Sequence, residues 1–382
     1  MKRNASASCL ILSPFDEATI TRGVGDCLEK LETNPDLVIA AVSSDYAEHL
    51  DDLIEILQIY GHATRIAGGS ASGHFGVGRT SENASCLSLL FLSLPRTRIA
   101  ISTGGTESHI AAAGHLFLYN PVAAETATAT FESTLRSFNT EAGGTPVIGG
   151  VISGGPDEED LFLFTENGRI KSISLSIALT GGLRIIPVVS QSCKPIGEPL
   201  VVTEVDENEV ISIARRKAFS VLEETFERLS WSDRIQADGN IFAGIAATES
   251  VDDFETGHFL IRPIIGADLA DGRLKLSSPA RAGQTIQFQM RDPAIAEADL
   301  RHHLGKVKEE HGKPFAGLLF GGRSRGVQLY GEPNQDAVTF RDKLGEFPLA
   351  GFFTHQEIGP IGGTVFRHDH SLCGALCFDE EV

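Results

Sequence analysis

Two arginines stand two residues apart in a glycine-framed stretch, and their side chains are well suited to bind an anion. Arg323 and Arg325 follow the apolar run Phe315–Phe320 and lie between Gly322 and Gly326. A guanidinium holds a carboxylate or phosphate through parallel hydrogen bonds, and glycine lets the ligand approach the backbone closely. We expect this loop to bind a small anion. The alternative is a turn whose arginines bond only local carbonyl groups.

A carboxylate and two histidines follow in the next loops. Glu357 comes after the apolar segment Pro348–Phe353, and His355 shares its face if the backbone stays extended. His368 precedes the last apolar segment of the chain. We expect Glu357 and the His368 region to form the wall opposite the arginines, with the Glu357 carboxylate holding an ammonium group and His355 as a further candidate ligand contact. Structural pairing of Glu357 with Arg325 is the open alternative.

The same side chains raise the question of a metal. His368 and His370 have His-x-His spacing, and His355 and Glu357 add two further potential ligands. Two histidines and one carboxylate suit a transition metal. Closeness in sequence does not imply convergence in space, so we favour hydrogen-bonded loop histidines and predict neither a metal nor a cofactor.

Paired glycines recur at the ends of two apolar runs. Gly68 and Gly69 end one of them, and Gly149 and Gly150 end another. Such pairs mark close packing or contact with a ligand. Packing is the favoured explanation, and we keep Gly68 and Gly69 as candidate ligand contacts.

The elements that position these residues follow a βαββ order. An apolar run at Pro35–Val42, a helix ending at Gly61 and two further strands make one such unit, and residues 315–378 repeat it. Part of the pattern recurs in the middle of the chain. The apolar spacing also predicts a long helix over Glu207–Leu229.

These elements indicate an α/β fold. We predict two domains with mixed, largely antiparallel sheets flanked by helices, arranged as an αββα layered sandwich built from βαββ-like units. The predicted ranges are an N-terminal helical segment at 1–34, a first domain at 35–206 and a second at 207–382. The acidic stretch Glu204–Glu209 suggests the boundary between the two domains.

Composition limits the partners. The chain has 382 residues, 32 Lys and Arg against 51 Asp and Glu, and a net charge of −19, so nucleic acids and anionic membranes are poor candidates. It shows no apolar run long enough to span a bilayer, no secretory signal and no Cys-x-x-Cys pair among its six cysteines. We therefore expect a cytoplasmic protein.

Several longer blocks resemble the FIST family. Gly257–Pro293, Ala316–Gly326, Leu349–Gly363 and His368–Leu372 resemble a FIST C domain. Pro35–Ser44, Arg65–Gly78 and Pro146–Gly155 resemble the FIST N domain that precedes it. The resemblance implies a sensory or signal-transduction module that binds small ligands such as amino acids. It matches Arg325 to the family's arginine, and Gly322 stands where the family often has cysteine.

We therefore expect an intracellular sensor of an amino acid or another small anionic or zwitterionic ligand, with a signalling protein as partner. Because the family's cysteine is missing, binding is favoured over catalysis. One alternative is a hydrolase- or transferase-type enzyme that uses His355, Glu357 and His368. The other is a protein-interaction scaffold without a small ligand.

Overall fold

The computed structural model describes residues 3–104, 112–121, 127–141, 143–155, 157–248 and 257–380. The chain divides into two compact units. Unit 1 consists of Met1–Ser190 and Leu300–Val382, and unit 2 of Gln191–Asp299. This division follows contacts in space, and the domain ranges expected from sequence stay predictions.

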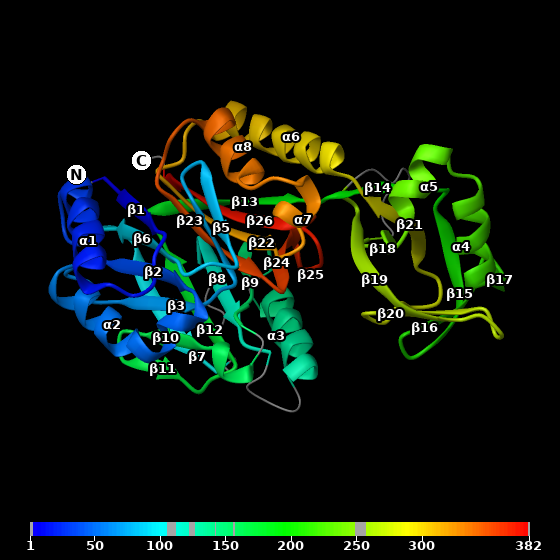
Figure 1. The fold of residues 1–382 in the computed structure, drawn as a ribbon, viewed down its shortest axis with the longest axis horizontal. Helices are drawn as coiled ribbons and strands as arrows, with labels where there is room; N and C mark the ends of the chain where they lie inside the picture. The colour runs from blue at the N-terminus through cyan, green and yellow to red at the C-terminus, as the bar shows by residue number, and fades with distance from the viewer. Residues whose placement is uncertain are drawn as a thin grey trace. The chain divides into compact units, whose positions relative to one another are not determined.

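Unit 1 contains three six-stranded sheets with the same plan, each built mainly by one repeat of the chain (Figure 1). The first repeat comprises β1 (Ala5–Ile11), α1 (Glu17–Leu31), β2 (Leu37–Val42), a short 3₁₀ helix (Ser44–His49), α2 (Leu50–Ile59), β3 (Ile66–Ser70), β4 (Gly73–Gly76), β5 (Arg79–Glu82) and β6 (Leu87–Ser93). The second comprises β7 (Arg98–Thr103), β8 (Gly114–Tyr119), α3 (Ala127–Glu141), β9 (Val147–Val151), a 3₁₀ turn (Glu158–Asp160), β10 (Leu163–Thr165), β11 (Gly168–Ile170) and β12 (Ser174–Thr180).

The third repeat begins with β13 (Leu183–Ser190) and resumes after unit 2. It continues with α6 (Pro293–His311), β22 (Ala316–Gly322), α7 (Val327–Tyr330), α8 (Gln335–Leu344), β23 (Leu349–Thr354), β24 (Gln356–Ile361), β25 (Thr364–His368) and β26 (Leu372–Asp379). The βαββ order expected twice, with part of it in the middle of the chain, therefore occurs three times.

Each repeat contributes four strands to its own sheet and a hairpin to another sheet. The orders are β1-β6-β2-β3-β10-β11, β7-β12-β8-β9-β24-β25 and β13-β26-β22-β23-β4-β5. In each sheet one pair of strands is parallel (β2 with β3, β8 with β9, β22 with β23) and the other pairs are antiparallel. The hairpins are exchanged in a cycle, from the first repeat to the third, the third to the second and the second to the first.

The sheets share one core and carry helices on their outer faces, as Figure 1 shows for α1 and α2. Ile39, Ile148 and Leu318, one from each sheet, belong to the same buried cluster. The outer faces form separate clusters with α1 and α2, with α3, and with α6 and α8. The helix–sheet–sheet–helix layering and the mainly antiparallel mixed sheets agree with the predicted α/β class, with three sheets sharing the core.

Unit 2 has its own sheet and core. It contains β14 (Cys193–Pro195), β15 (Leu200–Asp206), β16 (Glu209–Ile213), β17 (Arg216–Lys217), α4 (Ala218–Glu227), α5 (Trp231–Ala237), β18 (Ile241–Ala246), β19 (Phe259–Asp268), β20 (Arg273–Leu276) and β21 (Thr285–Arg291). Because β18 pairs with both β19 and β21, the sheet closes on itself around a buried apolar cluster.

Two predictions about elements are wrong in part. The stretch predicted as one helix over Glu207–Leu229 contains β16, β17 and α4, because left-handed backbone at Glu207, Ala214 and Arg215 turns the chain between strands. The segment 1–34 contains α1 but also β1, which pairs with β6. No helix in the described part of the chain is long and apolar enough to cross a membrane.

Candidate functional site

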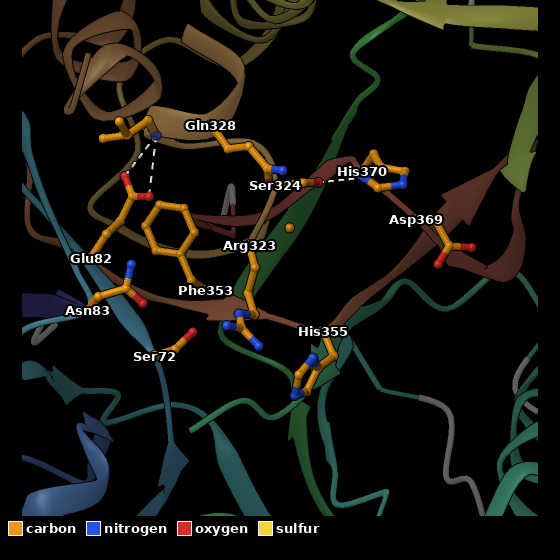
Figure 2. Close-up of a pocket in the computed structure, with 12 residues that line it drawn as sticks. Ser72, Glu82, Asn83, Arg323, Ser324, Gln328, Phe353, His355, Asp369 and His370 are labelled. Atoms are coloured by element: carbon orange, nitrogen blue, oxygen red, sulfur yellow. Dashed lines mark hydrogen bonds between the residues drawn. The ribbon is translucent and has the colours of Figure 1, made fainter. Parts of the chain in front are cut away.

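A cavity of about 600 Å³ lies at the ends of β22 and β23 in the third repeat (Figure 2). The loop after β22 forms one side, the ends of β23 and β25 form another, and the turn after β5 closes it from the first repeat. Its lining residues are Ser72, Glu82, Asn83, Gly322, Arg323, Ser324, Val327, Gln328, Phe353, His355, Asp369 and His370.

Arg323 and His355 give the cavity a basic side. Both side chains are exposed and lie near each other in Figure 2. The amide of Arg323 donates to the carbonyl of Thr354 (3.1 Å), which ties the two loops together. Within the described residues, the Arg323 guanidinium has no ion pair or hydrogen bond. Its charge is therefore available to a ligand.

The same arginine affects the protonation of His355. Desolvation lowers the pKa of His355, and the positive charge of Arg323 lowers it further. The imidazole therefore favours its neutral form, which can donate or accept a hydrogen bond. Binding of an anion between the two side chains would offset part of the repulsion from Arg323.

A serine and a histidine also meet in this cavity. The Ser324 hydroxyl and Nδ1 of His370 are hydrogen-bonded, as Figure 2 shows. His370 has φ of 61°, a backbone conformation uncommon for residues other than glycine. The Asp369 carboxylate accepts a hydrogen bond from the side-chain amide of Gln356 (2.9 Å). The cavity therefore holds basic, hydroxyl and carboxylate groups together.

Arg325 does not line this cavity, although the sequence favoured it as the principal ligand arginine. It is 1% exposed. Its Nε and Nη2 donate to the two carboxylate oxygens of Asp336 (2.8 and 3.2 Å), and its other contacts include the carbonyl and hydroxyl of Ser190 (both 3.0 Å). The Arg325 guanidinium therefore binds protein groups in the interior, and its hydrogen bonds connect α8 to the end of β13.

Glu357 lies beneath the floor of the cavity. The sequence had predicted that it would form part of the cavity wall. It is fully buried and accepts hydrogen bonds from the Ser371 amide (2.8 Å) and the Thr354 hydroxyl (3.2 Å). Burial raises the pKa of this carboxyl well above its usual range, and Asp369 raises it further. A Cβ at Gly322 would lie 3.0 Å from Glu357 Oε1, so this glycine lets the floor approach the carboxyl closely.

His368 is also buried and outside the lining. Its Nε2 lies 3.0 Å from the carbonyl of Gly359, and it pairs with Glu357 across β24 and β25. The cavity therefore contains His355 but neither His368 nor Glu357. No group of three or more His, Cys, Asp or Glu in the described ranges is placed to hold a metal ion.

The three candidate glycines have packing roles. A Cβ at Gly68 would overlap the carbonyl of Ala40 and the ring of Phe164, and one at Gly69 would press on Ile152. A Cβ at Gly326 would overlap the Glu82 carboxylate, whose oxygens accept from the amide of Val327 at 3.1 and 3.2 Å. None of the three lines the cavity.

Sequence reasoning missed the residues that the first repeat supplies. Ser72, Glu82 and Asn83 reach the cavity because the β4–β5 hairpin pairs with β23 of the third repeat. No local motif marks them. The sequence analysis also missed Ser324, which lies between Arg323 and Arg325. Its hydrogen-bond partner His370 is 46 positions away in the sequence, so no local pattern indicates the pair.

Two mycobacterial relatives of this chain bear the name uncharacterized protein. A protein of Mycobacterium bovis is 36% identical over 284 residues, which cover 74% of this chain and 72% of the relative. A protein of Mycobacterium tuberculosis is 31% identical over 359 residues, covering 90% and 92%. A cyanuric acid hydrolase from A. caulinodans aligns over 99% of this chain and 100% of its own, at 8% identity and a TM-score of 0.36, which is too distant to bear on function.

The models of two family domains match in the expected order. The FIST N domain matches residues 36–216, and the FIST C domain matches residues 218–360. Domains of this kind are generally sensory or signal-transduction domains. This chain belongs to the FIST family.

Proposed function

We propose that this protein is a sensor that binds a small carboxylate-bearing ligand, such as an amino acid, in the cavity at the ends of β22 and β23. The Arg323 guanidinium, unpaired within the described residues, carries this proposal. An arginine on a cavity wall with no protein partner is suited to a bidentate bond with a carboxylate. His355 adds a second hydrogen-bonding group beside it.

Carboxylates across the same cavity favour a zwitterion over a simple anion. Asp369 and Glu82 both line it. Asp369 is held by Gln356, and Glu82 by the amide of Val327. Carboxylate oxygens are the natural acceptors for an ammonium group. In this proposal Asp369 and Glu82 have the role that the sequence analysis predicted for Glu357 and His368, the wall opposite the arginine.

Signalling would follow from changes in the loops that line the cavity. Ligand bound to Arg323 contacts the loop after β22, which continues directly into α7. We propose that this segment presents the ligand state to a signalling protein, and that the protein acts in the cytoplasm, where its six free cysteines stay reduced.

Thermal unfolding with a panel of amino acids and small carboxylates tests the binding proposal. A ligand at 100 times its Kd adds about 2.7 kcal/mol to the free energy of unfolding. We expect at least one compound to raise the Tm, and Arg323→Ala to abolish the shift. Arg65→Ala is the matched control, since Arg65 is exposed and lies outside the lining. The proposal fails if no compound shifts the Tm, or if both variants respond alike.

The hydrogen bond between Ser324 and His370 supports a second candidate, a hydrolase. In it, the Ser324 hydroxyl would attack an ester carbonyl while Nδ1 of His370 takes its proton and returns it to the leaving alcohol, and water would then release the acid. A fluorophosphonate probe tests this: it would label the natural protein at Ser324 and leave Ser324→Ala unlabelled there. Absence of labelling at Ser324 removes the hydrolase candidate and leaves the sensor.

A further inference from the structure

The three repeats allow residues to be matched position by position. In each repeat a backbone amide at the end of one strand (β2, β8 or β22) donates a hydrogen bond to a backbone carbonyl that lies just before the last strand. The pairs are Ser43 to Cys86 (3.0 Å), Asn120 to Ile173 (2.8 Å) and Gly322 to Ser371 (2.9 Å). Ser43 therefore corresponds to Gly322. The next two residues of the first repeat, Ser44 and Asp45, correspond to Arg323 and Ser324.

The strands β3, β9 and β23 give an independent register. A Cβ at Gly68, Gly149 or Gly351 would overlap a carbonyl of the neighbouring parallel strand in each repeat, which makes these glycines equivalent. Four residues later, Ser72 corresponds to Ser153 and His355. Two of these positions meet, because the hydroxyls of Ser72 and Ser153 lie 3.1 Å apart, and the Ser153 hydroxyl donates to the carbonyl of Phe353, two residues before His355.

A second cavity, of about 260 Å³, occupies the place in the first repeat that the main cavity occupies in the third. Its lining residues are Ser43, Ser44, Asp45, Ala71, Ser72, Asn83, Ala84, Ser85, Gly154 and Gly155. Ser72 and Asn83 line both cavities, so the two adjoin there. A single extended molecule can pass from one cavity to the other along these two side chains.

The second cavity lacks the cationic side chain of the main cavity. Ser44 replaces Arg323, and Ser72 replaces His355, so the basic groups of the third repeat are absent from these positions. Asp45 replaces Ser324 and accepts a hydrogen bond from the Ser43 hydroxyl (2.5 Å). No Lys, Arg or His of the described ranges forms an ion pair with Asp45. Its carboxylate therefore faces the cavity without a cationic partner.

A second carboxylate adds to this field. A Cβ at Gly155 would overlap Oδ2 of Asp160, so that carboxylate lies directly behind the cavity wall. The backbone amides at the start of the 3₁₀ helix contribute a partial positive charge of about half a unit at most. Two carboxylates outweigh it, and the local field favours a cation.

We propose that the second cavity is a subsite for the primary ammonium group at the far end of an extended zwitterion, whose carboxylate binds Arg323 in the main cavity. This rests on the proposed function, because it assumes a carboxylate at Arg323. It narrows the ligand class to ω-amino carboxylates or amino acids with a basic side chain. The hydroxyls of Ser44 and Ser85 supply further acceptors for the ammonium.

Calorimetric titration of the full chain with chain-length pairs tests the subsite. The probes are 4-aminobutyrate, 5-aminovalerate and 6-aminohexanoate, each against the plain acid of the same length. We expect at least one amino acid to bind about two- to fivefold more tightly than its plain acid, the gain typical of one exposed ion pair. Asp45→Asn should remove that gain and leave the plain acid's Kd unchanged. Glu48→Gln is the control, since Glu48 is exposed and outside the lining.

Each outcome bears on one proposal or both. Equal binding within every pair, or an amino-acid preference that survives Asp45→Asn, overturns the subsite and leaves the carboxylate site at Arg323 standing. An equal loss in Glu48→Gln also overturns it, since the preference would then come from the general negative charge. If no compound of either series binds, the subsite falls, and the thermal panel alone decides the carboxylate site at Arg323.

Discussion

Arg323 and Arg325 show how two neighbouring residues of one type divide into a functional and a structural role. Their types and spacing predict an anion-binding loop, but only the fold decides which guanidinium faces the cavity. Asp336 and Ser190, which saturate Arg325, lie 11 and 135 positions away in sequence. No local pattern could have assigned those partners. The sequence therefore predicted the loop, but it did not predict that Arg323 would face the cavity and Arg325 the protein interior.

Replacement of Arg325 should unfold the protein more easily, and replacement of Arg323 should not. Arg325→Ala leaves the buried Asp336 carboxylate without its partner, and loss of one member of a buried pair costs about 3–5 kcal/mol. The exposed Arg323→Ala should change the free energy of unfolding by about 0.5 kcal/mol at most. Urea denaturation measures both.

A double variant separates the ion pair from simple packing. Arg325→Met with Asp336→Leu removes both charges, and we expect it to recover much of the stability that Arg325→Ala loses. If Arg325→Ala unfolds at the same urea concentration as the natural protein, the buried pair has no structural role.

Because of Glu357, the free energy of unfolding should fall as pH rises. Its folded-state pKa is raised, chiefly by burial, so the native protein holds a proton that the unfolded chain releases above about pH 4.5. The stability from this group is full below that pH and is lost as pH rises through the folded pKa. Glu357→Gln stays neutral and should flatten this part of the curve. Urea midpoints from pH 5 to 8 measure it, with Glu48→Gln as the control that keeps the natural slope.

At the scale of elements, the parallel strand pairs that position the cavity need glycine at one contact. Gly351 of β23 lies so close to β22 that a Cβ would overlap the carbonyl of Leu319. Gly351→Ala forces the pair apart and should cost about 3 kcal/mol or more. Gly25→Ala, inside α1 with open space around it, should instead stabilise by about 0.5–1 kcal/mol. Thermal unfolding of the two variants should move in opposite directions, and a tolerated Gly351→Ala would contradict the tight contact.

Apolar patterns predicted the β2–α2–β3 and β22–α8–β23 units because these strands are buried on both faces and their helices carry one apolar stripe. The same patterns failed at Glu207–Leu229, where Val210 and Ile213 of a strand are spaced like residues on a helix. The exchange of hairpins also escaped prediction. Strand pairing depends on the whole fold, and β4 joins β23 from more than 270 residues away. Hence Ser72 and Asn83 could not be assigned to the site from sequence.

At the scale of the molecule, three sheets of equal plan show that unit 2 is an insertion. The first repeat passes from β1 to α1 within a few residues, and the third places residues 191–299 at the same point, between β13 and the body of α6. Every residue that lines either the main cavity or the second cavity lies in unit 1. Unit 1 therefore contains every group that the proposed ligand contacts.

Removal of the insertion should leave a folded, ligand-binding protein. The amide of Asp292 donates to the carbonyl of Ser192 (2.9 Å), so a three-glycine linker can replace residues 193–291 with little strain. Because each sheet of unit 1 has its six strands without unit 2, we expect cooperative thermal unfolding of the shortened chain. Carboxylate affinity by calorimetry should stay within about twofold, since every residue that lines the two cavities belongs to unit 1. A shortened chain that folds but no longer binds would show that unit 2 contributes to the site, and one that does not fold would contradict its reading as an insertion.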